Sequence, residues 1–227
     1  MAQYDRMAVL NAIYDTGIVP VFYNEDPETT IHIVEACARG GARCAEFTNR
    51  GDLAYHVFTE TVRHVMAEKI DIIMGVGSIC DAPTAALYIA NGANFVVGPL
   101  LNEEVARLCN RRKIAYSPGC GSVSEIGQAE ELGVEIVKVF PGSEVGGPAF
   151  VKSVLGPCPW TRIMPTGGVN ATRESLEAWF TAGVAAVGAG SKLITKELVA
   201  DQDWDGLAAK VRQSVDWIRE IRAEMAG

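Results

Sequence analysis

The sequence predicts a single α/β domain, a closed (β/α)8 TIM barrel preceded by an N-terminal helix. Short apolar segments rich in β-branched residues alternate with segments of helical periodicity along nearly the whole chain. Strands that alternate with helices pair in parallel through right-handed crossovers. Eight such strands in 227 residues fit the compact end of the range for a barrel. An open, doubly wound sheet is the alternative, but no G-x-G-x-x-G motif follows the first strand.

The expected strands are residues 18–22, 42–47, 72–77, 95–99, 114–118, 135–140, 161–166 and 185–190. Helical segments follow at residues 29–41, 52–69, 81–92, 102–113, 122–133 and 170–183. Several of them start at an Asp, Asn, Ser or Thr cap and several end in Gly. An amphipathic helix over about 3–15 carries Met7, Leu10, Ile13 and Tyr14 on one stripe, and a final helix covers about 203–225. We therefore expect one domain over residues 1–227, with the barrel over about 17–200.

Composition excludes several classes of function. The chain has 20 Lys and Arg against 28 Asp and Glu, a net charge of −8, which argues against binding to nucleic acid or to an anionic membrane. No apolar run approaches the ~20 residues of a membrane span, and the N-terminus lacks the features of a signal peptide. Six cysteines without a C-x-x-C pair are typical of reduced core residues in a cytoplasmic enzyme. Three histidines without metal-ligand spacing disfavour a zinc centre, and we expect no cofactor.

The segment VKVFPG at 137–142 places Lys138 inside an apolar strand. Lysine is almost never fully buried without a partner, so its head could simply reach water while its stem packs. Alternatively, the apolar neighbours desolvate the ammonium and lower its pKa toward neutrality. A free amine facing a keto group forms a Schiff base, which then serves as an electron sink.

Schiff-base chemistry also needs a group that moves protons. Glu46 lies at the end of the second strand in CAEFTNR, where partial burial would raise its pKa and let it take and give protons. A salt bridge to Lys138 without any chemistry is the alternative. Arg50, in the following loop, could clamp a substrate carboxylate, although a lone loop arginine is more often solvated.

Two glycine-rich segments follow the last two strands, where barrels commonly bind phosphate. PTGGVN at 165–170 brings Gly167 and Gly168 to the start of a predicted helix, and GAGSKL at 188–193 adds Ser191. Backbone N–H groups in such a loop form an anion site, although glycines also make ordinary turns.

Taken in order, the motifs resemble those of the KDPG/KHG aldolases, the 2-keto-3-deoxy-6-phosphogluconate and 4-hydroxy-2-oxoglutarate aldolases. The matching motifs are E-x-T at 46–48, G-x-G-S at 75–78, VKVFPG at 137–142, PTGGV at 165–169 and GAGS at 188–191. The likeness covers about residues 17–200 and includes the spacing between the motifs.

The resemblance implies a metal-free class I aldolase, usually a homotrimer, that releases pyruvate and either glyceraldehyde 3-phosphate or glyoxylate. It makes Lys138 the Schiff-base lysine and Glu46 the general acid/base, acting through a water. The other matching positions are Arg50, Ser78 and Thr48 at the pyruvate carboxylate, Pro99 and Phe140 around the keto end, and Thr166, Gly167, Gly168 and Ser191 at the distal phosphate or carboxylate.

The chain departs from the family pattern at Tyr23, where some relatives have an arginine that contacts the substrate, and in the loop FTNRGD. Three rival functions are weighed. One is the related aldolase for the phosphogalactonate acid, and another is a non-catalytic barrel that binds a phosphate or keto acid. The third, a phosphosugar isomerase, would want an acid/base pair without a Schiff-base lysine.

Overall fold

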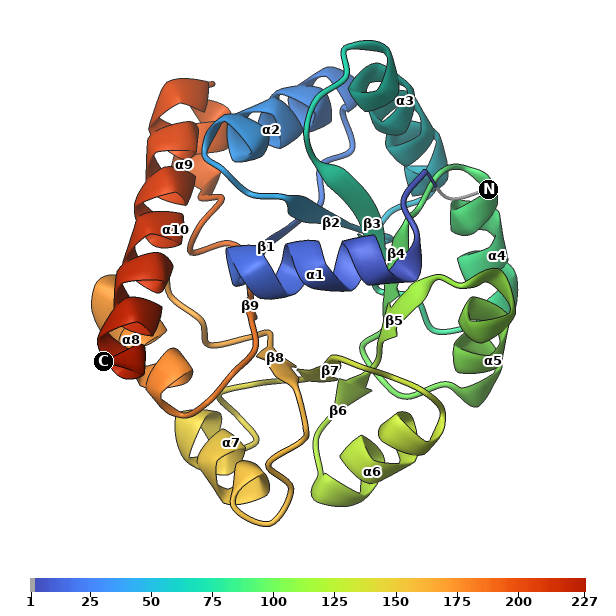
Figure 1. The fold of residues 1–227 in the computed structure, drawn as a ribbon. Helices are drawn as coiled ribbons and strands as arrows, with labels where there is room; N and C mark the ends of the chain where they lie inside the picture. The colour runs from blue at the N-terminus through green and yellow to red at the C-terminus, as the bar shows by residue number, and fades with distance from the viewer. Residues whose placement is uncertain (1–2) are drawn as a thin grey trace.

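The computed structural model describes residues 3–227 and shows parallel strands surrounded by helices (Figure 1). The strands pair in the order β5-β4-β3-β2-β1-β9 and, in a second group, β6-β7-β8. Their bounds are β1 Ile18–Phe22, β2 Cys44–Thr48, β3 Ile73–Gly77, β4 Phe95–Val97, β5 Ala115–Ser117, β6 Gly119–Cys120, β7 Val137–Val139, β8 Ile163–Pro165 and β9 Val187–Ala189. The predicted α/β barrel is confirmed, and each predicted strand is found within two residues of its expected ends.

Two narrow seams join the two groups of strands into the barrel. At the first, Pro118 alone separates β5 from β6, so the predicted strand at 114–118 continues past the proline to pair with β7. Proline has no N–H to donate to a ladder, which explains the break. At the second seam, a single parallel bridge joins Thr166, just after β8, to Gly188, in the middle of β9.

Helices cover the outside of the barrel (Figure 1). They are α2 Pro27–Arg39, α3 Ala54–Ala67, α4 Ala82–Ala90, α5 Glu103–Arg112, α6 Val123–Glu131, α7 Gly147–Leu155, α8 Arg173–Thr181, α9 Lys196–Ala200 and α10 Trp204–Ala226. The prediction included neither α7, which begins after Gly146 without a side-chain cap, nor α9, which has five residues. Helix α8 begins at Arg173 behind the Thr172 cap, so the glycine pair at 167–168 lies in a loop rather than at a helix start.

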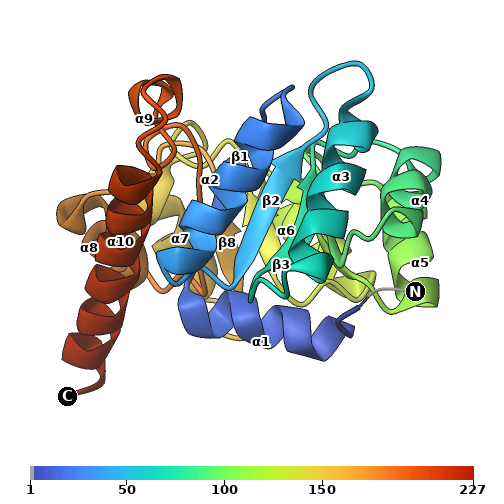
Figure 2. The same cartoon turned by 90° about the horizontal axis from the view of Figure 1, so that it is seen from above.

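Helix α1 (Arg6–Thr16) lies across the end of the barrel where the strands begin (Figure 2). Its buried residues are Val9, Ala12, Ile13 and Thr16, and Val9 and Ile13 pack with the apolar residues of the lower barrel interior. The predicted stripe is therefore wrong in part, because Met7 and Tyr14 are exposed. The final helix is confirmed: α10 buries Leu207, Val211, Val215 and Ile218 and packs on α2 and α8.

The period of two along each strand decides which side chains point into the barrel. On β2, Cys44 belongs to the apolar interior cluster near α1, and Glu46 and Thr48 follow it on the same face toward the carboxyl end. Ile136, just before β7, also belongs to that cluster, and Lys138 follows two residues later, in β7. The alternation thus places both ionisable groups inside the barrel, above its apolar floor.

Candidate active site

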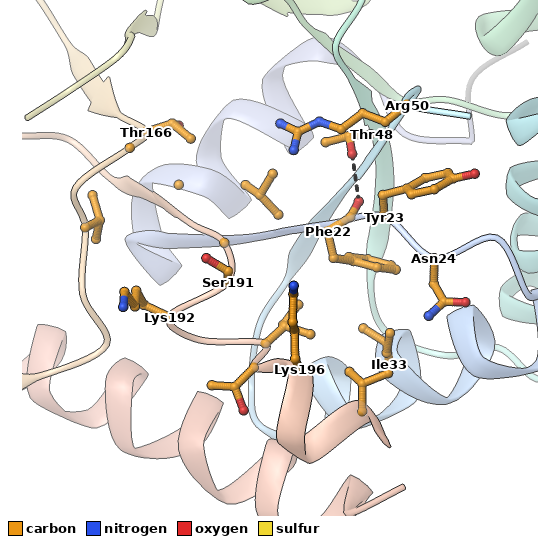
Figure 3. A pocket seen from close by; sticks show the side chains of 18 of the residues that line it. Phe22, Tyr23, Asn24, Ile33, Thr48, Arg50, Thr166, Ser191, Lys192 and Lys196 are labelled. Atoms are coloured by element: carbon orange, nitrogen blue, oxygen red, sulfur yellow. Dashed lines mark hydrogen bonds between the residues drawn. The ribbon is translucent and has the colours of Figure 1, made fainter. Parts of the chain in front are cut away.

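A cavity of about 760 Å³ opens at the carboxyl ends of β1, β2, β8 and β9 and extends to α9 (Figure 3). This is the face at which barrel enzymes carry their active sites. Among the residues predicted from sequence, its walls include Thr48, Arg50, Phe140, Thr166, Gly167, Gly168 and Ser191.

Glu46 is buried in the middle of β2, two residues before the strand ends, and 1% of its surface is exposed. Its carboxyl group lies over Gly77 of β3, where an added Cβ would be 1.8 Å from Oε1. Glycine at 77 is therefore what allows the carboxylate to fit there. Both carboxyl oxygens are buried and have no hydrogen-bond partner among residues 3–227, which is rare and costly for a buried polar group.

Lys138 is the middle residue of β7 and is 5% exposed, so its ammonium does not reach bulk water. The Nζ atom lies 4.8 Å from the centre of the Phe140 ring, which itself lines the cavity. A cation over an aromatic face is favourable, but it replaces little of the lost hydration. Lys138 therefore lies directly behind the cavity wall, in surroundings that disfavour its charged form.

The two groups influence each other without direct contact. Because the Glu46 oxygens have no partner, the predicted alternative of a direct salt bridge to Lys138 is not observed. Burial lowers the pKa of the Lys138 ammonium; the Glu46 carboxylate opposes this shift, and the Arg50 charge adds to it. Burial raises the pKa of the Glu46 carboxyl, and the charges of Lys138 and Arg50 oppose that rise. Both shifts favour the neutral form of the group concerned.

A group of polar side chains lies at the ends of β2 and β3. Thr48 is the last residue of β2, and its hydroxyl donates a hydrogen bond to the Phe22 carbonyl at 3.2 Å (Figure 3). This bond connects the ends of β1 and β2. Arg50 Nε lies 3.3 Å from the Ser78 hydroxyl, which fixes one side of the guanidinium. Ser78 is thus adjacent to the cavity through Arg50, although it is not part of the cavity wall.

The glycine loop lines the opposite wall. Gly167 and Gly168 both have positive φ values, of 93° and 75°, which only glycine adopts readily. Among the backbone hydrogen bonds of residues 3–227, none is donated by the N–H of Gly168 or Val169. The Thr166 hydroxyl is likewise buried without a partner, and Ser191 is exposed beside it in the cavity. These groups could together bind an anion.

Pro99 lies apart from the cavity wall, with its carbonyl against Gly119. Tyr23, by contrast, lines the cavity and packs its ring against Phe47, with centroids 5.7 Å apart. Its hydroxyl covers Gly51, where a Cβ would be 1.9 Å away. Tyr23 therefore supports the loop that carries Arg50.

Sequence reasoning missed the part of the cavity formed by Asn24, Ile33, Lys192 and Lys196. The segment of α9 is too short to give a periodic signal, so Lys196 resembles an ordinary surface lysine in the sequence. The signal that could have found this wall is the position of these residues just after β1 and β9, whose carboxyl ends meet at this face.

Histidines and cysteines lie elsewhere. His32 and His64 lie on α2 and α3 and share Glu35, at 3.3 and 2.8 Å. Within the described residues, no three His, Cys, Asp or Glu side chains are grouped so as to hold a metal ion. The six cysteines are free thiols. Each helix in residues 3–227 is too short or too polar to cross a bilayer.

The fold and the site define a class of protein: a (β/α)8 barrel with a buried lysine and carboxyl group below a cavity on its catalytic face. The family model described as KDPG and KHG aldolase matches residues 9–210. The chain belongs to the KDPG/KHG aldolase family and is an aldolase, a carbon–carbon lyase.

Individual relatives agree with the family assignment. The chain is 29% identical over 216 residues to a 2-dehydro-3-deoxy-phosphogluconate aldolase of Haemophilus influenzae, covering 95% of this chain and 99% of the relative. It is 31% identical to the enzyme of the same name from Pseudoalteromonas atlantica, covering 87% and 89%. The crystal structure of a KDPG aldolase from Legionella pneumophila, with pyruvate captured as a covalent carbinolamine, aligns with a TM-score of 0.81 and 26% identity, covering 94% and 98% of the two chains.

Proposed function

We propose that this protein reversibly cleaves 2-keto-3-deoxy-6-phosphogluconate or 4-hydroxy-2-oxoglutarate to pyruvate and an aldehyde, through a Schiff base on Lys138. The observation that carries the proposal is the buried Lys138 behind the Phe140 wall of the cavity, together with a buried Glu46 whose carboxyl oxygens have no hydrogen-bond partner within residues 3–227. Burying two ionisable groups that form no ion pair costs desolvation free energy, which a purely structural role would not explain. Schiff-base catalysis, by contrast, uses both an amine nucleophile and a group that transfers protons.

The reaction begins with a bond between the lysine and the substrate. The neutral amine of Lys138 attacks the C2 carbonyl to give a carbinolamine, which loses water to form a protonated imine. Glu46, acting through a water, supplies the proton that leaves with the hydroxyl group. The raised pKa of Glu46 and the lowered pKa of Lys138 place both groups in the forms that this step needs.

Carbon–carbon cleavage follows from the imine. Glu46 receives the proton of the C4 hydroxyl, the C3–C4 bond breaks, and its electron pair moves into the imine to give an enamine. The aldehyde leaves as glyceraldehyde 3-phosphate or glyoxylate. The enamine is then protonated at C3, and water hydrolyses the imine to release pyruvate and the free amine.

The other groups hold the substrate in place. Arg50 and Ser78, which are hydrogen-bonded to each other, would bind the carboxylate next to the keto group, with Thr48 beside them. Phe140 would shape the keto end, with Pro99 behind it. Thr166, Gly167, Gly168 and Ser191 would bind the distal phosphate or carboxylate through N–H and hydroxyl groups on the opposite wall.

The deciding experiment is reductive trapping. Wild-type protein is incubated with pyruvate and borohydride, and the added mass is located by peptide mapping; we expect a stable adduct on Lys138. Lys138→Met should give no adduct and no cleavage, whereas Glu46→Gln should lower kcat by roughly 10²–10⁴-fold. The control is Lys152→Met, on the exposed side of α7, which should be labelled like wild type. An adduct elsewhere, or none, contradicts the proposal.

The rival functions give other results in the same assays. Faster cleavage of the stereoisomeric 2-keto-3-deoxy-6-phosphogalactonate would identify the related aldolase. A non-catalytic barrel would bind phosphate but would form no adduct. We also propose that the protein is a cytoplasmic homotrimer, as the family resemblance implies; light scattering of the purified protein tests the oligomeric state.

A further inference from the structure

Two hydrogen-bond donors at the outer end of the cavity have no role in the mechanism above. Lys196, at the start of α9, directs its side chain into the cavity, and Asn24, after β1, lies at the neighbouring wall (Figure 3). They come from opposite ends of the chain but meet here because β1 and β9 are paired in parallel.

The hydrogen bonds of Asn24 determine which way its amide faces. Its Oδ1 accepts the backbone N–H of Asp26 at 2.9 Å, and its backbone carbonyl accepts the Thr30 hydroxyl at 3.3 Å. Because a backbone N–H can only donate, its partner must be the amide oxygen. The NH2 group is thereby left to face the cavity, toward Lys196 (Figure 3).

The charge of the cavity points to an anionic ligand. Its ionisable lining among residues 3–227 consists of Arg50, Lys192, Lys196 and Tyr23, with no Asp or Glu, in a chain whose net charge is −8. Within the same residues, neither Arg50 nor Lys196 forms an ion pair. Cations without carboxylate partners that line a concave site raise the local concentration of anions.

The cavity also extends beyond the glycine loop. Its volume of about 760 Å³ lies in the upper part of the ~300–1,000 Å³ range of small-molecule sites. Ile33, from α2, and Val199, from α9, bound the extension on its outer side. A longer keto acid with a terminal phosphate would fill more of this volume than a five-carbon diacid.

We infer that Asn24 and Lys196 are specificity-determining residues that select keto acids with a terminal phosphate ester over the shorter dicarboxylate. This inference rests on the proposed function and decides between its two substrates. A phosphate ester carries close to two negative charges and three acceptor oxygens. It can therefore be bound by the glycine loop, the Lys196 ammonium and the Asn24 amide together, whereas a carboxylate offers one charge and two oxygens.

The test compares three substrates: the phosphorylated acid, 2-keto-3-deoxygluconate without the phosphate, and 4-hydroxy-2-oxoglutarate. In Lys196→Met, we expect kcat/KM for the phosphorylated acid to fall about tenfold, mainly through KM, because one charge-assisted hydrogen bond is lost. The values for the other two acids should remain within twofold. Asn24→Asp, which adds a negative charge, should lower kcat/KM for the phosphorylated acid further. Lys196→Arg, which keeps the positive charge, should retain most of the wild-type kcat/KM.

The control is again Lys152→Met, which removes the same charge from the exposed side of α7. An equal loss on all three substrates, or no change in their ratio, overturns the inference. Pyruvate trapping on Lys138 in each variant separates this result from failure of the proposed function. Should the wild type form no adduct, titration with glycerol 3-phosphate still decides: weaker binding by Lys196→Met supports the phosphate site, and equal binding overturns it.

Discussion

At the scale of single residues, Lys138 and Glu46 show how burial inside the barrel favours the uncharged forms of an amine and a carboxyl group. Each follows an apolar residue on the inward face of its strand, so the alternation of the strand alone carries it away from water. The field of Arg50 acts on both groups in a useful direction, since it disfavours the ammonium and tempers the rise in the carboxyl pKa. The pKa shifts of Lys138 and Glu46 therefore come from where the strands place the two side chains.

The lowered pKa of Lys138 predicts the pH dependence of enamine formation. In the proposed mechanism the neutral amine of Lys138 is the nucleophile, so the rate of enamine formation should rise with pH up to the pKa of Lys138 in the folded protein and then become constant. Because burial moves that pKa below the ordinary 10.5, the plateau should begin below pH 10.5. The measurement is deuterium exchange into the methyl group of pyruvate, followed by NMR between pH 5 and 11.

Lys138→Met is the blank for this experiment, since exchange without it reports the buffer alone. A rate that continues to rise up to pH 10.5 would mean that the amine is solvated, and it would count against the buried nucleophile.

The candidate site could be predicted in part at this scale. Lys138 and Glu46 were visible because an ionisable residue inside an apolar strand is unusual. Their burial is observed, whereas their catalytic roles remain predictions. Asn24 and Lys196 carry no comparable local signal, because polar residues beside a Pro-started helix or in a five-residue helix are common. Only the pairing of β1 with β9 brings them to one wall.

At the scale of elements, the strands followed from sequence more faithfully than the helix ends. Strand positions depend on apolar runs bounded by glycine and proline, which the sequence shows directly. Helix α8 begins later than expected because Thr172 caps it, while the glycines before it take positive φ values. The face of α1 was predicted wrongly in part because periodicity alone does not say which stripe will meet the barrel.

Helix α1 should contribute strongly to stability, since it closes the lower end of the barrel. Ile13 is 1% exposed, and Ile13→Ala should cost about 2–5 kcal/mol of unfolding free energy through lost burial and the cavity that remains. Met7→Ala, on the exposed side of the same helix, should change it by less than about 0.5 kcal/mol. Urea unfolding followed by circular dichroism measures both; similar values for the two variants would contradict this role of α1.

At the scale of the whole molecule, the family and the site chemistry predict activity without a metal ion. In the proposed mechanism, the imine formed on Lys138 withdraws electrons from the breaking bond, so no Lewis acid is needed. Dialysis against EDTA should therefore leave kcat/KM for the aldol cleavage unchanged within error. Loss of activity that is restored by added Mg²⁺, Mn²⁺ or Zn²⁺ would instead indicate a metal-dependent reaction.

The second seam of the barrel lies at the proposed anion site. β8 and β9 are linked by the Thr166–Gly188 bridge, and the loops that follow this bridge carry Gly168 and Ser191. A phosphate bound by both loops would connect β8 and β9 across this seam. Binding of the substrate phosphate would then also stabilise the closure of the barrel at the point where the ligand binds.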